Sequence, residues 1–264
     1  MDPFSSVELI KRAKMEQDDQ LRWKYVSALH RRGGREVMDR AVELLDSEKA
    51  GDRSLGADIL GQLGVPAKPF LEERLSKLTE LLERETEAEV LASGATALGH
   101  LGHLGALDAL LQLAQHPSAE VRFSIAGALP SCLGKPEDER GIQALIELSN
   151  DEDEDVRDWA VFGLGSQVDA NSAAVREALY SRIDDVHEDT RDEALVGLAH
   201  RRDERVIEPL LARLSSDEVG PLNVEAAREI GSPRLYEALV NLKEWWDLDH
   251  NLLAEAIERC RPRT

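Results

Sequence analysis

The strongest constraint in this sequence is a short pattern that returns seven times along the chain. In its clearest copy, "VRDWAVFGLG", an arginine follows the anchor valine, small apolar residues come four and five positions on, and Leu-Gly comes eight and nine positions on. The copies are anchored at Leu21, Asp52, Val90, Val121, Val156, Thr190 and Leu222, with spacings of 31 to 38 residues. A period of this length is typical of repeat proteins, whose units stack because none can bury its apolar face alone.

Each copy is followed, after a short break, by a second segment with apolar residues at helical spacing. These segments run from "REVMDRAVELLD" in the first unit to "PRLYEALVNLKEWW" in the last. Leu and Ala dominate the apolar residues, aromatic residues make up only 4%, and runs of β-branched residues at period two are missing. The pattern therefore predicts an all-α chain of helix pairs that stack into an α-solenoid.

Small residues recur at fixed places in the first segment of each unit. The fifth position after the anchor is apolar in every copy, and we expect it to let the first helices of adjacent units pack closely; it reads Val26, Ala57, Ala95, Ala126, Val161, Leu195 and Ala227. A glycine also recurs near the end of this segment, at Gly61, Gly99, Gly165 and Gly231. Because glycine tolerates the left-handed conformation of a helix C-cap, we expect it to end each first helix.

The frame D-x-x-V-R-x-x-A-x-x-x-L-G resembles the HEAT repeat, in particular the short bacterial type grouped with phycobilin lyase subunits. Its closest copies are "EDEDVRDWAVFGLG" and "EDTRDEALVGLAHRRDERVIEPLL". The resemblance implies a right-handed superhelix of about seven two-helix repeats over residues 18–246, with capping helices in 1–17 and 247–264. The whole chain, 1–264, is then a single domain. The resemblance also implies that the second helices line a concave surface that holds another macromolecule.

The second segments predict an acidic strip on that concave surface. When they are aligned on their central apolar pair, one face carries acids and amides and no basic residue. The residues of this predicted partner-binding strip are Asp108, Gln112, Gln143, Glu147, Glu177, Glu208 and Glu237. An alternative interpretation is that this face is only solvated helix surface.

A second candidate site lies where the charge is densest. Residues 151–200 hold 14 acidic and 4 basic side chains, whereas residues 1–50 hold 10 of each. The acidic run 150–155 is mainly expected to cap and charge a helix start. Its sixth residue after Asn150 is Val156, where a calcium loop needs glycine, so we expect no metal site. Trp159 falls in a mostly polar column and is expected to be partly exposed. The candidate partner contacts here are Asp153, Asp155, Asp158 and Trp159.

The net charge of −20 excludes several classes of partner. Nucleic acids and anionic membranes both need clustered basic residues, so neither is expected as a partner. The two cysteines, Cys132 and Cys260, lack metal or redox spacing, and no leader or long apolar run is evident. We therefore expect a cytoplasmic protein with reduced thiols. No nucleophile, metal or phosphate motif is found, so we expect no catalysis and no cofactor.

Two functions follow from these observations. The first is a non-catalytic scaffold, a monomer or weak dimer, that binds a basic protein in its concave face; a bacterial inhibitor or immunity protein against a toxin is one specific form. The alternative is a lyase-like or chaperone-like helper that binds or attaches a small cofactor. It would need an apolar pocket with a reactive group, and neither Cys132 nor the scattered histidines converge on one in the sequence.

Overall fold

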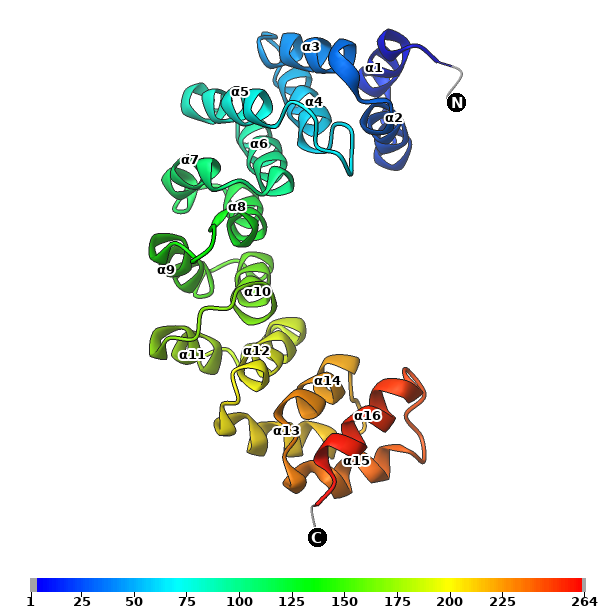
Figure 1. The fold of residues 1–264 in the computed structure, drawn as a ribbon, viewed down its shortest axis with the longest axis vertical. Helices are drawn as coiled ribbons and strands as arrows, with labels where there is room; N and C mark the ends of the chain where they lie inside the picture. Colours follow the sequence, from blue (N-terminus) through cyan, green and yellow to red (C-terminus); the bar gives the residue numbers. More distant parts are fainter. Residues whose placement is uncertain (1–3, 263–264) are drawn as a thin grey trace. The chain divides into compact units, whose positions relative to one another are not determined.

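The computed structural model describes residues 4–262 and consists of helices joined by short turns, with no strand among those residues (Figure 1). The helices form two compact units, Met1–Gly141 (unit 1) and Ile142–Thr264 (unit 2). In both units, a first helix that carries the repeated pattern alternates with a second helix. The all-α fold of repeated helix pairs is therefore confirmed, whereas a single domain over 1–264 stays a prediction.

Unit 1 begins with the terminal helix α1 (Ser6–Met15). The N-terminal capping helix is predicted within 1–17, of which residues 1–3 lie outside the described part of the chain. Its first helices are α2 (Asp19–Arg32), α4 (Ala50–Gly61), α6 (Ala88–Leu101) and α8 (Ala119–Cys132). Its second helices are α3 (Gly34–Leu45), α5 (Leu71–Arg84) and α7 (Leu107–Leu113), the last preceded by the 3₁₀ turn η1 (Leu104–Ala106). Helix α9 (Glu139–Leu148) begins at the end of unit 1 and continues into unit 2.

Unit 2 continues the same alternation. Its first helices are α10 (Glu154–Phe162), α12 (Glu188–His200) and α14 (Pro221–Ile230), and α10 runs on into a π-helical turn, η2 (Gly163–Gln167). Its second helices after α9 are α11 (Ala173–Tyr180), α13 (Ile207–Leu214) and α15 (Tyr236–Leu242); the 3₁₀ turns η3 (Glu204–Val206) and η4 (Pro233–Leu235) precede the last two. The terminal helix α16 (His250–Cys260) packs against α14.

The core follows the repeated pattern. The predicted apolar column at the fifth position after the anchor is fully buried in all seven copies: Val26, Ala57, Ala95, Ala126, Val161, Leu195 and Ala227. The anchors Val90, Val121 and Val156 are equally inaccessible to solvent. Burying one Val or Leu side chain contributes roughly 1.5–3 kcal/mol, so each repeat depends on the apolar surface that the neighbouring repeats provide.

The recurring glycine serves close packing in three of its four copies. Gly99 and Gly165 lie within helical turns, Gly61 is the last residue of α4 without a left-handed conformation, and only Gly231 is a left-handed C-cap, with φ 62°. A Cβ atom on Gly99 would lie 2.8 Å from the Cα atom of Ala128 in the next first helix. The expectation that this glycine ends the first helix is therefore wrong for Gly99 and Gly165, and the expected left-handed conformation is also absent at Gly61, because the space between backbones decides the residue at these three positions.

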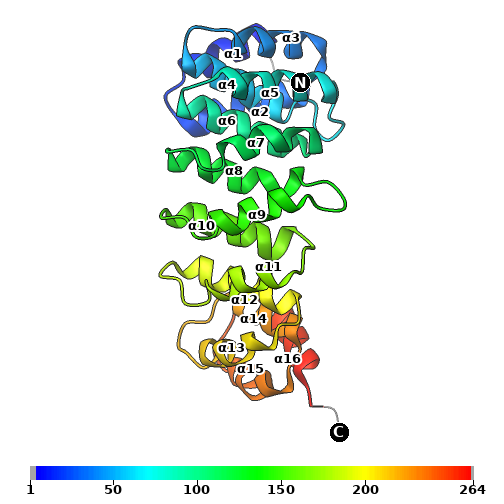
Figure 2. The same cartoon turned by 90° about the vertical axis from the view of Figure 1, so that its left-hand side faces the viewer.

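The first helices form the closely spaced row in both units. In unit 1, Gly61 on α4 meets the backbone of α6 and Gly99 on α6 meets the backbone of α8, whereas α5 and α7 contact each other sparsely. In unit 2, Gly165 and Gly197 bring η2 and α12 together in the same way. In a curved two-row stack the closer row is the inner one. Figure 1 shows α5 and α7 forming a separate row beside α6 and α8, and Figure 2 views the stack from the side of α5 and α7. The expectation that the second helices line the concave surface is therefore wrong for each unit.

A buried arginine closes the end of a first helix in unit 1. The side chain of Arg74, on α5, is 1% exposed and donates hydrogen bonds to the carbonyl oxygens of Leu60, Gly61, Leu63 and Pro69 at 2.7 to 3.2 Å. Burial lowers the pKa of Arg74 to about 10. This guanidinium replaces the missing intrahelical partners of the last carbonyls of α4.

The end of the last repeat is held by one of two adjacent tryptophans. Trp246 is buried, and its indole Nε1 donates a 2.7 Å hydrogen bond to the carbonyl oxygen of Val219. Trp245 is 49% exposed and does not share this packing role. Of the two tryptophans, Trp246 alone therefore packs the end of the last repeat.

Candidate partner-binding surface

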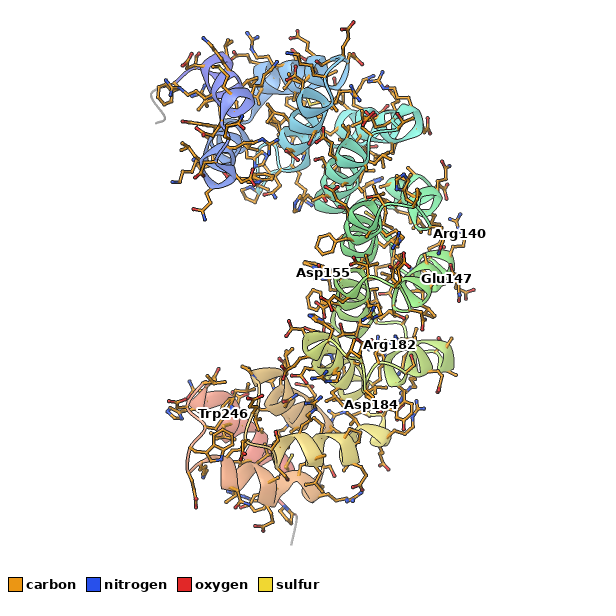
Figure 3. All side chains as sticks on the ribbon, turned by 180° about the vertical axis from the view of Figure 1, so that it is seen from behind. Arg140, Glu147, Asp155, Arg182, Asp184 and Trp246 are labelled. Atoms are coloured by element: carbon orange, nitrogen blue, oxygen red, sulfur yellow. The ribbon has the colours of Figure 1, made fainter. Side chains whose placement is uncertain are left out.

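The predicted acidic strip lies on the outer row of each unit. All seven residues are exposed on second helices: Asp108, Gln112, Gln143, Glu147, Glu177, Glu208 and Glu237. Within unit 2, Figure 3 shows Glu147 on the opposite side from Asp155, which belongs to the first helix α10. The strip is therefore not concave, and its partner-binding role stays a prediction.

Arginines from the next repeat neutralise three acids of this strip. Arg140 pairs with Asp108 at 2.8 Å in unit 1, and Arg205 pairs with Glu177 at 3.0 Å in unit 2. Arg234 and Glu208 form the same kind of pair one repeat further on. The expectation that this face carries no basic residue is wrong, because basic residues outside the aligned positions reach back across the helix row.

Each of the first two arginines is itself held by an aspartate two residues earlier. Asp203 accepts hydrogen bonds from the guanidinium of Arg205 at 2.9 and 3.0 Å and from its backbone amide at 3.2 Å. These bonds lower the pKa of Asp203 to about 2. Asp138 holds Arg140 in the same arrangement. The tripeptide Asp-Glu-Arg at 138–140 and 203–205 is the sequence signal for this pairing.

The acidic run before α10 is mainly a helix start, as expected. The carboxylate of Asp153 accepts hydrogen bonds from the amides of Asp155 and Val156 at 3.1 and 3.2 Å, so Asp153 is the N-cap of α10. Such a cap is worth about 1 kcal/mol. Asp153 is thus occupied by its own helix, while Asp155 in the first turn is exposed.

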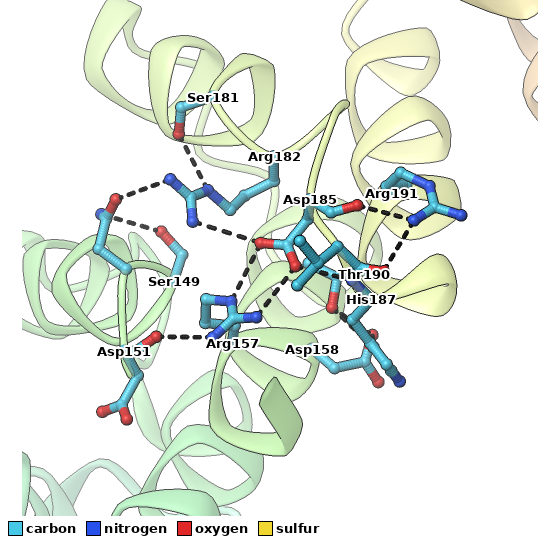
Figure 4. A network of polar contacts seen from close by, with 12 residues as sticks. Ser149, Asp151, Arg157, Asp158, Ser181, Arg182, Asp185, His187, Thr190 and Arg191 are labelled. Carbon is cyan, nitrogen blue, oxygen red and sulfur yellow. Dashed lines mark hydrogen bonds and ion pairs between the residues drawn. The ribbon is translucent and has the colours of Figure 1, made fainter. Parts of the chain in front are cut away.

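The arginine that follows the anchor ties neighbouring repeats together. Arg157 makes two 3.0 Å bonds to the carboxylate of Asp185 and also donates to the carbonyl oxygens of Asp151 and Glu152 (Figure 4). Burial alone would raise the pKa of Asp185, but the bonds from Arg157 and the His187 amide lower it below its usual value. In unit 1, Arg53 forms the same bidentate pair with Glu85. The arginine that follows the anchor in these two repeats is therefore structural.

The inner face of α10 carries two aromatic rings. Trp159 is 39% exposed, which confirms the expectation for this position, and its ring meets that of Phe162 edge to face with centroids 5.9 Å apart. Phe162 is half-buried and supports the indole from one side. A large aromatic side chain held in one orientation at a surface is typical of residues that dominate binding energy at interfaces.

Acidic side chains on the first helices α10, α12 and α14 form a cluster of like charge on the same row as these rings. We call this set, together with Trp159 and Phe162, the aromatic–acidic surface; its acids are Asp155, Asp158, Asp189, Glu193 and Glu225. Asp158 accepts a 3.3 Å hydrogen bond from Thr190, and Glu193 accepts a 3.4 Å bond from Ser166. Asp158 lies 4.0 Å from His187 Nδ1, and Glu225 pairs with Arg228 at 3.5 Å. Within residues 4–262, Asp155, Asp189 and Glu193 make no ion pair, unlike Asp108, Glu177 and Glu208 on the outer row.

Burial and neighbouring negative charges raise the pKa of two carboxyls of this surface, Glu193 and Asp158. Burial and then the charge of Asp158 raise the pKa of Glu193 to about 7, with smaller effects of Glu225 and Asp189. Burial likewise raises the pKa of Asp158. A cationic group would therefore be attracted here, because it would relieve this repulsion.

Glu193 and Phe162 were not selected from the sequence. Glu193 occupies the same repeat position as Trp159, three residues after its anchor, so the aligned column contained the signal. That signal became meaningful only when the first helices proved to be the inner row.

The two cysteines offer no reactive thiol. Cys132 and Cys260 are both fully buried, and burial raises the pKa of each thiol to about 11. In the part of the chain that the structure describes, no three His, Cys, Asp or Glu side chains gather closely enough to hold a metal ion. None of the described helices is both long enough and apolar enough to cross a membrane.

Known proteins share both the repeat and the fold. Models of HEAT repeats match residues 75–165 and 142–231, which together are more than half of the chain. Protein YibA of Escherichia coli strain K12 is 26% identical over 235 residues, covering 88% of this chain and 83% of YibA. The X-ray structure of YibA from E. coli superposes with a TM-score of 0.71 at 24% identity and covers 98% of each chain.

A second solved structure has the same kind of fold. The complex of CpcE and CpcF of phycocyanin lyase from Nostoc matches with a TM-score of 0.53 at 14% identity, over 98% of this chain and 96% of that chain. At this identity the likeness concerns the fold alone. The repeated frame, the stacked helix pairs and the matching models agree, and the chain belongs to the HEAT-repeat family.

Proposed function

We propose that this chain is a non-catalytic interaction protein that binds a basic segment of another protein on the aromatic–acidic surface of unit 2. The observation that carries the proposal is the partly exposed Trp159, braced by Phe162, on the same row of helices as Asp155, Asp189 and Glu193, three carboxylates that make no ion pair among residues 4–262. The HEAT-repeat fold supports the coarser statement, since its stacked helices present extended surfaces to other proteins.

A lysine or arginine side chain would supply the positive charge that Asp155, Asp189 and Glu193 do not find among residues 4–262. A cation over the face of an indole is stabilised by about 0.5–1 kcal/mol at an exposed site and by about 2 kcal/mol when desolvated. The same cation would lower the pKa of Glu193, so that its carboxyl loses its proton and becomes a charged partner. The outer acids fit this role less well, because Glu177 and Glu208 already hold Arg205 and Arg234.

The proposal includes a cytoplasmic protein without catalytic activity, and an inhibitor or immunity protein against a basic toxin is one specific form of it. The alternative, a helper that attaches a small cofactor, needs a reactive group beside a pocket. The buried, protonated thiols of Cys132 and Cys260 do not supply one.

A fluorescent oligolysine peptide tests the proposal directly. We expect saturable binding to the full chain, measured by fluorescence anisotropy, and no binding of an oligoglutamate peptide of the same length. Affinity should fall steeply with salt, because the Debye length shortens from about 10 Å at 0.1 M to about 3 Å at 1 M. Absence of oligolysine binding at low salt would remove the basic partner from the proposal.

Matched variants locate the binding surface. Trp159→Ala should weaken oligolysine binding several-fold, whereas Trp245→Ala removes a tryptophan of similar exposure from outside the surface and should leave binding unchanged. Charge reversal at Glu177 and Glu208 together tests the outer strip. If this double variant weakens binding and Trp159→Ala does not, the partner binds the outer row instead.

A further inference from the structure

An open cavity of about 620 Å³ in unit 2 has the opposite charge character to the rest of the chain. It lies where the carboxyl ends of α14 and α16 come together, and it is lined by Arg202, Ile230, Gly231, Glu258, Arg259, Arg261 and Pro262. We call it the arginine cavity. Its volume is within the range typical of small-molecule sites. Three arginines around one cavity are unexpected in a chain whose net charge is −20.

Arg202 is fixed at the edge of the cavity by its own backbone and by the end of α14. Its φ of 54° is a left-handed conformation that non-glycine residues seldom adopt. Its Nη1 atom donates to the carbonyl oxygens of Glu229 and Ile230. Within residues 4–262 its Nε and Nη2 atoms make no hydrogen bond, so the N–H groups on that edge of the guanidinium can donate to a ligand.

Arg259 supplies a second guanidinium with available donors. It lies in the last turn of α16, is exposed, and makes no side-chain hydrogen bond or ion pair with any residue the structure describes. Arg261 pairs with Glu258 at 3.1 Å, both on the solvent side. The cavity therefore has a surplus of unpaired N–H donors.

Helix ends and one acid oppose this positive charge without cancelling it. Each helix carboxyl end carries about half a negative charge, and Glu258 adds one. Arg202 already neutralises two carbonyl oxygens of α14. Three guanidinium groups outweigh these contributions, so the cavity favours an anion.

We propose that the arginine cavity binds an oxyanion group, either a phosphate or a carboxylate. The planar guanidinium presents parallel N–H donors that match two oxygens of such a group, and these charge-assisted bonds are among the strongest polar contacts in proteins. The site is separate in residues and in charge from the aromatic–acidic surface. The proposal therefore stands or falls independently of the proposed function.

Titration of the full chain with inorganic phosphate, followed by amide NMR signals at constant ionic strength, tests this site. We expect saturable shifts at Arg202, Gly231 and Arg261. A parallel titration with acetate distinguishes the source, since the probe that saturates at the lower concentration identifies the preferred oxyanion. Shifts that grow linearly with both probes would overturn the proposal.

Two variants separate the site from general charge. Arg259→Gln should raise the half-saturation concentration about tenfold, because one charge-assisted bond is lost. Arg213→Gln is the matched control, since Arg213 also lies in the last turn of a helix, α13, and does not line the cavity. Circular dichroism verifies that both variants fold. Equal weakening in both variants, or none in Arg259→Gln, would contradict the assignment.

Discussion

Replacing Glu193 by glutamine should stabilise the protein in a pH-dependent way. The native pKa of this carboxyl is raised from 4.5 to about 7, mainly by burial and by the charge of Asp158. Between these two values the native state binds more protons than the unfolded state. Stability of the wild type therefore falls as pH rises from about 4.5 to about 7, and it is level above that range.

The magnitude follows from the size of the shift. One pKa unit corresponds to about 1.36 kcal/mol, so the full shift of Glu193 would be worth about 3 kcal/mol. Partial exposure of the side chain reduces this figure, and we expect about 2 kcal/mol at pH 8. Glutamine keeps the shape and an acceptor for Ser166 but carries no charge, so Glu193→Gln should recover this amount at pH 8 and nothing at pH 4.5.

Urea unfolding followed by circular dichroism at pH 4.5, 6 and 8 measures the difference in unfolding free energy between wild type and variant. Glu237→Gln, an exposed glutamate on the outer row, is the control and should leave stability within about 0.5 kcal/mol at each pH. A difference for Glu193→Gln that is the same at pH 4.5 and pH 8 would refute the argument. It would mean that packing, not charge, separates the two side chains.

Three further predictions concern the packing of the repeats, each measured as a change in unfolding free energy. Arg74→Met should destabilise unit 1 by about 3 kcal/mol or more, because four carbonyl oxygens lose a buried donor; a loss below about 1 kcal/mol would mean that water replaces the guanidinium. Gly99→Val should cost about 1–3 kcal/mol or more, the cost of overpacking a core, since even a Cβ atom would lie 2.8 Å from Ala128; Gly51→Val on α4 is the control, because a Cβ atom there would meet nothing within 4 Å. Leu164→Ala should cost about 2–5 kcal/mol as a fully buried truncation, and a loss near zero would place its side chain outside the core.

The sequence was sufficient to predict the repeats because the repeated frame records the packing of one helix against the next. Every residue of the fifth-position column is buried, which requires the predicted period and the predicted helix faces. The partly exposed Trp159 was predictable for the same reason, since its column is otherwise polar. What the frame does not state is which of the two helix rows is the inner one.

The row assignment nevertheless had a sequence signal that was interpreted differently. The recurring glycine predicts helix ends by its conformation, but Gly61 and Gly99 lie against Ala97 and Ala128 and allow the first helices to approach. Small residues mark the closely spaced row, and the closely spaced row is the inner one. Ion pairs across repeats were harder to predict, because Arg140 and Asp108 are 32 residues apart and meet only when the repeats are in register.

The distribution of paired and unpaired acids argues for a function of the inner face of unit 2. Net charge alone cannot separate the two rows, because both carry acids. On the outer row, Glu177 and Glu208 are matched by arginines one repeat on. On the inner face, Asp155, Asp189 and Glu193 lack such a match among residues 4–262, and Glu193 is held where its charge is unfavourable. Solubility requires charge but does not require an arrangement that costs stability, whereas a surface prepared for a cation does.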